Sequence, residues 1–129
     1  MNGRYLFDTN IVIALFAKDP SVQDRMKGAT EVFVPATVLG ELYYGAQKSK
    51  HIQENLERIN NFAKDNVVIA CTTETAKLYG EIKNQLRKKG RPIPENDIWI
   101  AAISKQYHLT LVSRDAHFNE IEEFPIEEW

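Results

Sequence analysis

Apolar residues fall in short runs separated by polar and turn-forming residues along the 129-residue chain. Four of these runs, rich in β-branched and aromatic residues, predict strands, and the continuous apolar run before Asp8 is typical of a strand that is buried on both faces. A fifth strand is predicted over residues 124–126, and its proline would confine it to an edge of the sheet. The four strands are predicted over residues 4–7, 32–34, 67–69 and 109–112.

Between the strands, apolar positions recur at intervals of three and four, which is typical of amphipathic helices. The clearest case is the set Ile52, Leu56, Ile59 and Phe62. Asp19 followed by Pro20 predicts a helix start, because aspartate caps a first turn and proline fits its first position. Helices are predicted over residues 11–16, 20–27, 37–47, 52–62, 73–89 and 95–103.

Two of these helices carry further signals. The helix over residues 73–89 is predicted to start at a threonine cap, Thr72 or Thr73, and to end at Gly90. The helix over residues 95–103 contains six consecutive apolar residues, so we expect it to be buried nearly all round. The inner face of the first of these helices is predicted to carry Ala76, Tyr79, Ile82 and Leu86.

The alternation of strands and helices predicts an α/β fold. Parallel strands joined by right-handed helical crossovers give a three-layer α/β/α sandwich with a central parallel sheet of four to five strands. A chain of 129 residues can bury one hydrophobic core and is too short for two comfortable ones. We therefore expect a single domain over residues 1–129, with no linker, repeat or low-complexity segment.

Composition excludes several classes of protein. Hydrophobic residues make up 43% and charged residues 26%, which is ordinary for a globular domain, and the net charge of −2 does not indicate general nucleic-acid binding. The longest apolar run, residues 11–17, is far too short to span a membrane, and no signal-like start is present, so we expect a cytoplasmic protein. A single cysteine, Cys71, excludes an internal disulfide, and His51, His108 and His117 lack zinc-ligand spacing.

Acidic residues stand where a parallel sheet would bring them together. Asp8 directly follows the first strand and Asp115 closely follows the fourth, so adjacent strands would place both carboxylates in the crevice where strand order reverses. Asp97 lies in the first turn of a helix, and Glu41 lies early in another. Each acid also has a simpler interpretation. Asp8, Thr9 or Asn10 could cap the next helix, and Asp115 could cap a turn. Asp97 could be an ordinary first-turn acid, and Glu41 could be a solvated helix residue.

A cluster of carboxylates would need compensation. Two unit charges about 4 Å apart repel by about 4 kcal/mol at an effective dielectric near 20. All-oxygen ligation without cysteine or histidine suits Mg²⁺ or Mn²⁺. A metal held in this way can activate water and neutralise phosphate oxygens, which indicates phosphodiester chemistry.

Four segments, residues 6–11, 41–45, 96–102 and 111–118, together resemble PIN-domain ribonucleases, specifically the VapC-like toxins of type II toxin–antitoxin pairs. The resemblance spans essentially the whole chain. It implies that the acids hold one or two Mg²⁺ or Mn²⁺ ions and that a metal-activated water attacks an RNA phosphodiester. It also implies a homodimer and a cognate antitoxin that blocks the site. The matching acids are Asp8, Glu41, Asp97 and Asp115.

The resemblance also implies supporting roles. Ser113 would hydrogen-bond to the acids, Thr9 or Asn10 would orient Asp8, and Asn96 would support its neighbour Asp97. The family varies most at the position of Asp115, so its role as a ligand or as a helix cap stays open.

RNA phosphates could be held by cations outside the acid cluster. The candidates are Arg87, Lys88, Lys89, Arg91 and Arg114. The run before Gly90 has a simpler interpretation, because cations in a last helical turn stabilise the helix. Tyr43 and Tyr44 could stack on bases, or pack in the core or a dimer face.

Other functions share parts of this pattern. A phosphatase of the haloacid dehalogenase type needs a second aspartate two residues after the first, where this chain has Asn10. A phosphorelay receiver needs an acidic pair near the first strand, and Gly3 and Arg4 offer none. A non-catalytic PIN-like protein-binding module would not require all four acids, which are present here.

Overall fold

The computed structural model describes residues 3–129, and its centre is a five-stranded sheet in which every paired strand runs parallel to its neighbour. The sheet has the order β3-β2-β1-β4-β5, which confirms the predicted parallel sheet. The strands are β1 (Arg4–Phe7), β2 (Glu31–Pro35), β3 (Val67–Ile69), β4 (Thr110–Val112) and β5 (Ile126–Glu127).

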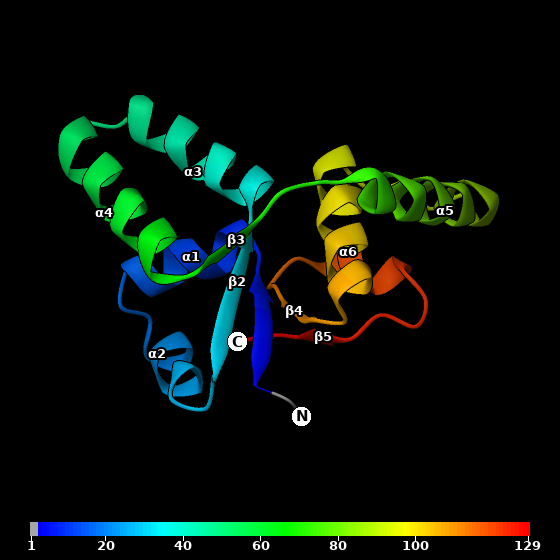
Figure 1. The fold of residues 1–129 in the computed structure, drawn as a ribbon, viewed down its shortest axis with the longest axis horizontal. Coiled ribbons are helices and arrows are strands. Elements are labelled where there is room, and N and C mark those ends of the chain that lie inside the picture. The colour runs from blue at the N-terminus through cyan, green and yellow to red at the C-terminus, as the bar shows by residue number, and fades with distance from the viewer. Residues whose placement is uncertain (1–2) are drawn as a thin grey trace.

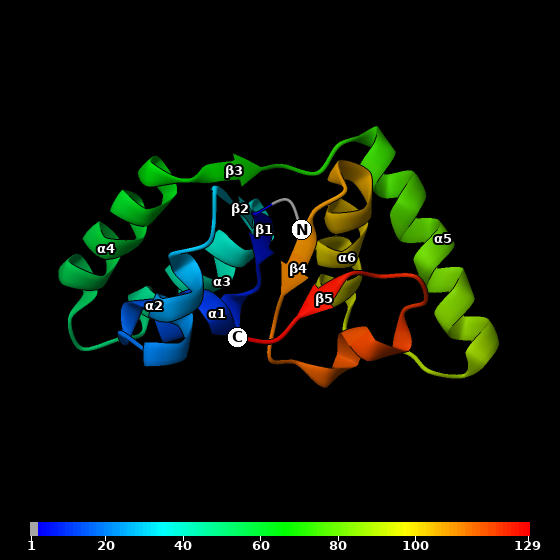
Figure 2. The ribbon, with the colours of Figure 1, turned by 90° about the horizontal axis from the view of Figure 1, so that it is seen from below.

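Helices cover both faces of this sheet, as the predicted three-layer sandwich requires. Figures 1 and 2 show α1 to α4 on one side of the strands and α5 and α6 on the other. The helices are α1 (Thr9–Phe16), α2 (Pro20–Met26), α3 (Ala36–Gln47), α4 (Ile52–Asp65), α5 (Thr73–Lys89) and α6 (Glu95–Tyr107), with a 3₁₀ turn η1 (Ala116–Glu120) before β5.

Strand order reverses beside β1. The chain moves outward from β1 through β2 to β3, and then returns across the opposite face of the sheet to β4. Phe7 pairs with Val112, and the amide of Asp8 donates to the carbonyl of Val112 at 3.1 Å. The residues that follow β1 and β4 therefore lie side by side at the carboxyl edge, which is where parallel sheets bind ligands.

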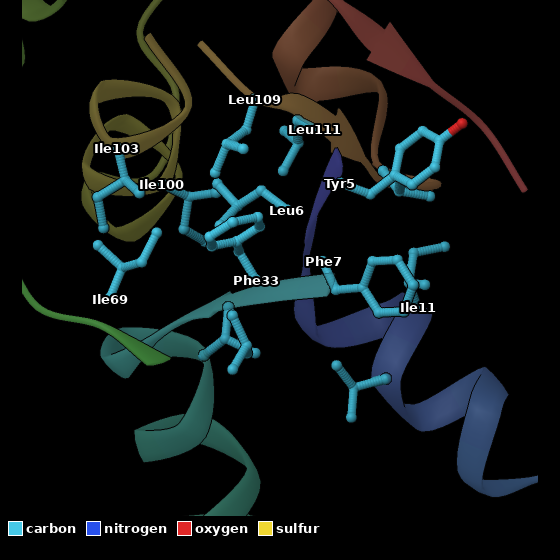
Figure 3. Close-up of a cluster of buried hydrophobic side chains, with 14 of the residues drawn as sticks. Tyr5, Leu6, Phe7, Ile11, Phe33, Ile69, Ile100, Ile103, Leu109 and Leu111 are labelled. Carbon is cyan, nitrogen blue, oxygen red and sulfur yellow. The ribbon is translucent and has the colours of Figure 1, made fainter. Parts of the chain in front are cut away.

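The core explains why β1 is apolar on both faces. Figure 3 shows Leu6 beside Ile100 of α6, while Tyr5 and Phe7 point to the opposite side of the sheet. Leu6, Phe7 and Ile100 are fully buried. Helix α6 presents buried residues all round, as the apolar run predicted, and it continues to Tyr107 beyond the predicted end.

Trp129 closes the core beside β1. Its ring is 5% exposed and meets the rings of Tyr5 and Phe7 edge-on, with centroids 4.9 and 5.3 Å away. Its main-chain oxygen accepts hydrogen bonds from Ser21 Oγ at 3.1 Å and from the guanidinium of Arg114 at 2.9 Å. The end of the described chain is thereby attached to the segment that follows β4.

Two details of the sequence interpretation were wrong. Ala76 is exposed, and Thr75 is the fully buried residue of that turn, because its hydroxyl forms a capping box with Thr72. The last strand begins at Ile126, after Pro125, whose carbonyl accepts from Leu111 although its nitrogen cannot donate.

None of the helices described in residues 3–129 is long and apolar enough to cross a membrane.

Candidate active site

Asp8 lies directly after β1 and is 5% exposed. One carboxylate oxygen, Oδ1, accepts from the amide of Thr9 at 2.8 Å and so caps α1. The other, Oδ2, accepts from Ser113 Oγ at 2.7 Å and from Asn10 Nδ2 at 3.2 Å. The capping role and a role in a site are therefore compatible, because the cap fixes the carboxylate at the point where strand order reverses.

Burial raises the pKa of Asp8, although hydrogen bonds from Ser113 and Thr9 act in the opposite direction. The negative charges of Glu41 and Asp115 raise this pKa further. The buried carboxylate accepts hydrogen bonds from three residues, and within residues 3–129 no ion pair with a cation is described for it. A metal ion would complete this environment.

The segment after β4 is fixed by the same hydrogen-bond network. Ser113 is 3% exposed, and its hydroxyl accepts from the amide of Asp115 at 3.0 Å while it donates to Asp8. The side-chain oxygen of Asn10 accepts from the amide of Arg114 at 3.0 Å. Asn10 therefore connects the start of α1 to this segment, in line with the supporting roles expected for Asn10 and Ser113.

Asp97 and Asp115 face each other beside Asp8. Asp97 lies in the first turn of α6, and its side chain is 13% exposed. Asp115 caps η1 by accepting from the amide of His117 at 2.9 Å. Burial raises the pKa of Asp97, and the charges of Asp8 and Asp115 raise it further, while a hydrogen bond with His117 lowers it.

His117 was not predicted as part of the site from the sequence, yet it contacts two of the acids. Its Nδ1 lies 3.1 Å from Asp97 Oδ2 and 3.0 Å from Asp115 Oδ1. The hydrogen bond with Asp97 raises the pKa of the imidazole above its ordinary value. No fixed ligand spacing could reveal this contact, because His117 meets Asp97 across 20 residues of sequence.

Glu41 joins the site from the other side of the sheet. Its Oε2 accepts from Thr9 Oγ1 at 3.0 Å, and its Oε1 accepts from Asn96 Nδ2. These contacts tie α3 to the first turns of α1 and α6. Glu41 is thus an exposed residue whose carboxylate has two neighbouring donors at the carboxyl edge of the sheet.

The cations expected to hold RNA lie in two places. Lys89 Nζ donates to the main-chain oxygen of Glu120 at 2.6 Å, and Arg91 lies 3.9 Å from the carboxylate of Glu120. Arg87 donates only to Asn84 among the contacts described, and no hydrogen bond or ion pair involves Lys88 within residues 3–129. Lys89 and Arg91 therefore fasten α5 to η1, while Arg87 and Lys88 project from the last turn of α5.

Arg114 is held away from that run. Its guanidinium donates to Asp19 Oδ2 at 3.0 Å as well as to Trp129.

Of the two tyrosines on α3, Tyr43 donates to Asn60 of α4, and Tyr44 is 67% exposed. The geometry favours packing for Tyr43 and leaves Tyr44 on the surface.

The donor set fits a divalent cation. Ligand atoms of Asp97, Asp115 and His117 all lie within 4.8 Å of one another. Burial and mutual repulsion raise the pKa values of Asp8 and Asp97, so a positive charge here would relieve both. Among the sequence candidates, the structure brings together Asp8, Glu41, Asp97, Asp115, Thr9, Asn10, Asn96 and Ser113.

The fold and the acids define an α/β domain with an acidic site at the point where strand order reverses. The sequence model of the PIN domain family matches residues 5–123 of the chain. The chain therefore belongs to the PIN domain family.

Relatives with known names match over nearly their whole length. The chain is 34% identical to Ribonuclease VapC2 of Haemophilus influenzae, with 98% of each chain covered. It is 29% identical to the tRNA(fMet)-specific endonuclease VapC of Shigella flexneri, again with 98% of each covered. It also superposes on a chain in the crystal structure of DNA-bound VapBC from Salmonella typhimurium, with a TM-score of 0.90, 27% identity and 98% of each chain covered.

Proposed function

We propose that the chain is a single-domain, metal-dependent ribonuclease and the toxin of a type II toxin–antitoxin pair. The observation that carries this proposal is the convergence of four carboxylates on the carboxyl edge of β1 and β4 in a PIN-family fold. The names of the relatives, ribonuclease and tRNA(fMet)-specific endonuclease, support RNA as the substrate.

Each acid has a proposed role in hydrolysis. Asp8, Asp97 and Asp115 would hold Mg²⁺ or Mn²⁺, and the ion would supply positive charge that neutralises phosphate oxygens and activates water. Ser113 and Asn10 keep the Asp8 carboxylate in place through the hydrogen bonds to Oδ2. Glu41, held by Thr9 and Asn96 at the open side, orients the attacking water and accepts its proton.

The products follow from the groups that are present. His51 and His108 lie at the ends of α4 and α6, so the described residues provide no histidine pair beside the acids for attack by the RNA 2′-hydroxyl. Water is therefore the nucleophile, and cleavage leaves a 5′-phosphate and a 3′-hydroxyl.

An RNA cleavage assay tests the proposal. We expect the purified chain to cut RNA with Mn²⁺ or Mg²⁺, to stop in excess EDTA, and to lose activity in Asp8→Asn. Asp24→Asn is the matched control, because Asp24 is an exposed acid of α2 paired with Lys27. Cleavage that persists in EDTA, a 2′,3′-cyclic phosphate product, or full activity of Asp8→Asn would contradict the proposal; a chain that binds metal without cutting would instead support a non-catalytic module.

An apolar groove adjoins Glu41. A groove of about 380 Å³ between α1, α3 and α4 includes Ile13, which is 54% exposed, as well as Phe16 and Leu42. The Salmonella neighbour was solved as VapBC, and we propose that a cognate antitoxin covers this groove and blocks the site. An apolar groove beside an acidic site suits a protein segment that presents apolar side chains and one cation.

A growth assay tests the partner. We expect expression of the chain alone to arrest growth, Asp8→Asn to relieve the arrest, and co-expressed antitoxin to relieve it in the wild type. Ile13→Glu should remain toxic even when the antitoxin is co-expressed. Ile52→Glu, which lies outside the groove, should remain toxic alone and should still be neutralised by the antitoxin. Equal toxicity of wild type and Asp8→Asn would show that the arrest does not come from the acids.

We also propose a homodimer. The exposed ring of Tyr44 on α3 is a surface that a second copy could cover. Light scattering on the purified chain would show twice the monomer mass of 14.8 kDa, and a monomer at micromolar concentration would contradict the proposal.

A further inference from the structure

His117 places a nitrogen donor among the oxygen donors of the acid cluster. Its Nδ1 lies 3.1 Å from Asp97 Oδ2 and 3.0 Å from Asp115 Oδ1, and the three residues come from α6, the residue before η1, and η1 itself. Half of the His117 side chain is exposed, so the ring reaches the acids from the solvent side.

We infer that His117 is a metal ligand, and that the site is a mixed oxygen and nitrogen site that prefers Mn²⁺ to Mg²⁺. This inference rests on the proposed metal-dependent function. It extends the proposed function by naming Mn²⁺ as the preferred ion and His117 as the residue that causes this preference.

The distances suit shared coordination. Two ligands at right angles around an ion with bonds of about 2.1 Å lie about 3 Å apart. The separations of Nδ1 from the two carboxylate oxygens, 3.1 and 3.0 Å, have this value. The ligand atoms of the three residues all lie within 4.8 Å of one another, so a single ion could be shared among them.

The backbone holds the ring in this position. Asp115 accepts from the amide of His117 at 2.9 Å, and its own amide donates to Ser113 at 3.0 Å. Phe118, the next residue, is fully buried and anchors η1 in the core. His117 is therefore pre-positioned by the turn that Asp115 caps.

The chemistry of the donors sets the preference. Mg²⁺ takes oxygen ligands and keeps several waters, whereas imidazole suits transition metals, with affinity rising from Mn²⁺ to Co²⁺. Loss of the imidazole should therefore weaken Mn²⁺ and Co²⁺ binding more than Mg²⁺ binding.

A histidine that only offsets the charge of the acids would behave differently. Removing such a positive group would leave the charges of Asp97 and Asp115 uncompensated and the net charge of the site more negative. Every divalent ion would then bind more tightly. The direction of the affinity change therefore separates a ligand from a counter-charge.

Calorimetric titration of the purified chain with MgCl₂ and MnCl₂ tests the inference. We expect His117→Gln to lose about tenfold or more in Mn²⁺ affinity, since even indirect partners of metal ligands are worth that much, with a smaller loss for Mg²⁺. His117→Asp should keep binding but lower the Mn²⁺ to Mg²⁺ affinity ratio. His51→Gln is the matched control, because His51 is exposed and lies at the start of α4.

Pulsed electron paramagnetic resonance of bound Mn²⁺ gives a direct signature. We expect coupling to ¹⁴N in the wild type and in His51→Gln, and its loss in His117→Gln. Bound Mn²⁺ without ¹⁴N coupling in the wild type, coupling retained in His117→Gln, or tighter binding of both ions by that variant would overturn the inference and leave the proposed function standing. A wild type that binds neither ion would overturn both.

Discussion

At the scale of single residues, Asp8 shows how a helix cap and a candidate ligand can be the same side chain. The cap bond to Thr9 uses one carboxylate oxygen, and Ser113 and Asn10 orient the other. The same burial that makes these bonds strong also disfavours the charge of the carboxylate. The metal-free protein therefore carries a cost at Asp8 that depends on pH.

This cost predicts a pH dependence of stability. Because the pKa of Asp8 is higher in the folded state, the folded protein binds the proton more tightly, and its stability falls as pH rises from the ordinary aspartate pKa through the raised value. Urea unfolding in EDTA across this range should show that Asp8→Asn gains stability relative to wild type with rising pH, and that the difference is constant above the raised pKa. A difference that does not vary with pH would show that Asp8 is not perturbed.

Asp97→Asn should remove metal binding without destabilising the metal-free protein. Burial and the charges of Asp8 and Asp115 oppose ionisation of Asp97, so the amide relieves repulsion of about 1 kcal/mol and raises the melting temperature by about 4 °C or leaves it unchanged. In wild type, metal at 100 times its Kd should add about 2.7 kcal/mol, a response that the variant should largely lose. A clear drop in metal-free melting temperature, with the full metal response, would make Asp97 a structural residue only.

The residues found from sequence and the one that was missed differ in a physical way. Asp8, Asp97 and Asp115 stand at fixed places relative to strand and helix ends, so local pattern and strand adjacency predict their meeting. His117 joins them because Asp115 turns the chain into η1 and directs the ring toward α6. That direction depends on side-chain geometry in a short turn, which apolar periodicity does not describe.

At the scale of elements, the segment between β4 and η1 is held from both sides. Asn10 and Ser113 bind it to the start of α1, while Arg114 binds it to Asp19 at the start of α2 and to Trp129. Two helix starts and Trp129, two residues after β5, therefore set the position of Asp115. Arg114 is accordingly better placed to hold this segment than to hold RNA.

Trp129→Ala should weaken both the core and this segment. Loss of a buried ring that packs against Tyr5 and Phe7 should cost about 3–5 kcal/mol of unfolding free energy. Trp129→Phe should cost clearly less, because an aromatic ring remains. Urea unfolding measures both, and a cost for the alanine variant below 1 kcal/mol would show that the ring is not part of the core.

Elements that carry a strong period or a continuous apolar run could be predicted, and elements decided by a single side chain could not. The sequence of α6 revealed its burial because its apolar residues occupy every face. On α5 a polar residue, Thr75, replaced the expected Ala76 in the interior, since its hydroxyl is satisfied by Thr72 and Gln106. Hydrophobicity alone cannot identify a buried threonine that has one partner three residues away and the other 31 residues away.

At the scale of the whole molecule, the two helical layers carry different surfaces. The face formed by α1, α3 and α4 holds the apolar groove, while the last turn of α5 on the opposite side carries Arg87 and Lys88. The acids lie between the two, at the edge of the sheet. A partner protein and an RNA strand could therefore approach the site from different sides.

Charge reversal at Arg87 and Lys88 tests the RNA side. Each lost phosphate contact should reduce the slope of log affinity against log salt by about 0.7 for single-stranded RNA, so Arg87→Glu with Lys88→Glu should lower it measurably. Lys27→Glu, directly after α2, is the matched control, because Lys27 is also exposed and lies on the other layer. Filter binding of the catalytically inactive Asp8→Asn chain to RNA at several salt concentrations gives the slopes, and an unchanged slope would leave these cations as helix-end residues only.

The strand order also decides when a newly made chain can become active. Central strand β1 is synthesised first, but its neighbour β4 comes near the end, and the bond from Ser113 to Asp8 spans 105 residues. At about 5–20 residues per second, the ribosome needs roughly 5 to 20 seconds to make the chain between them. Until residue 97 is made, the nascent protein has at most two of the four acids, and one edge of β1 stays unpaired throughout the interval. The fold thus delays assembly of the complete acidic site until translation is nearly finished.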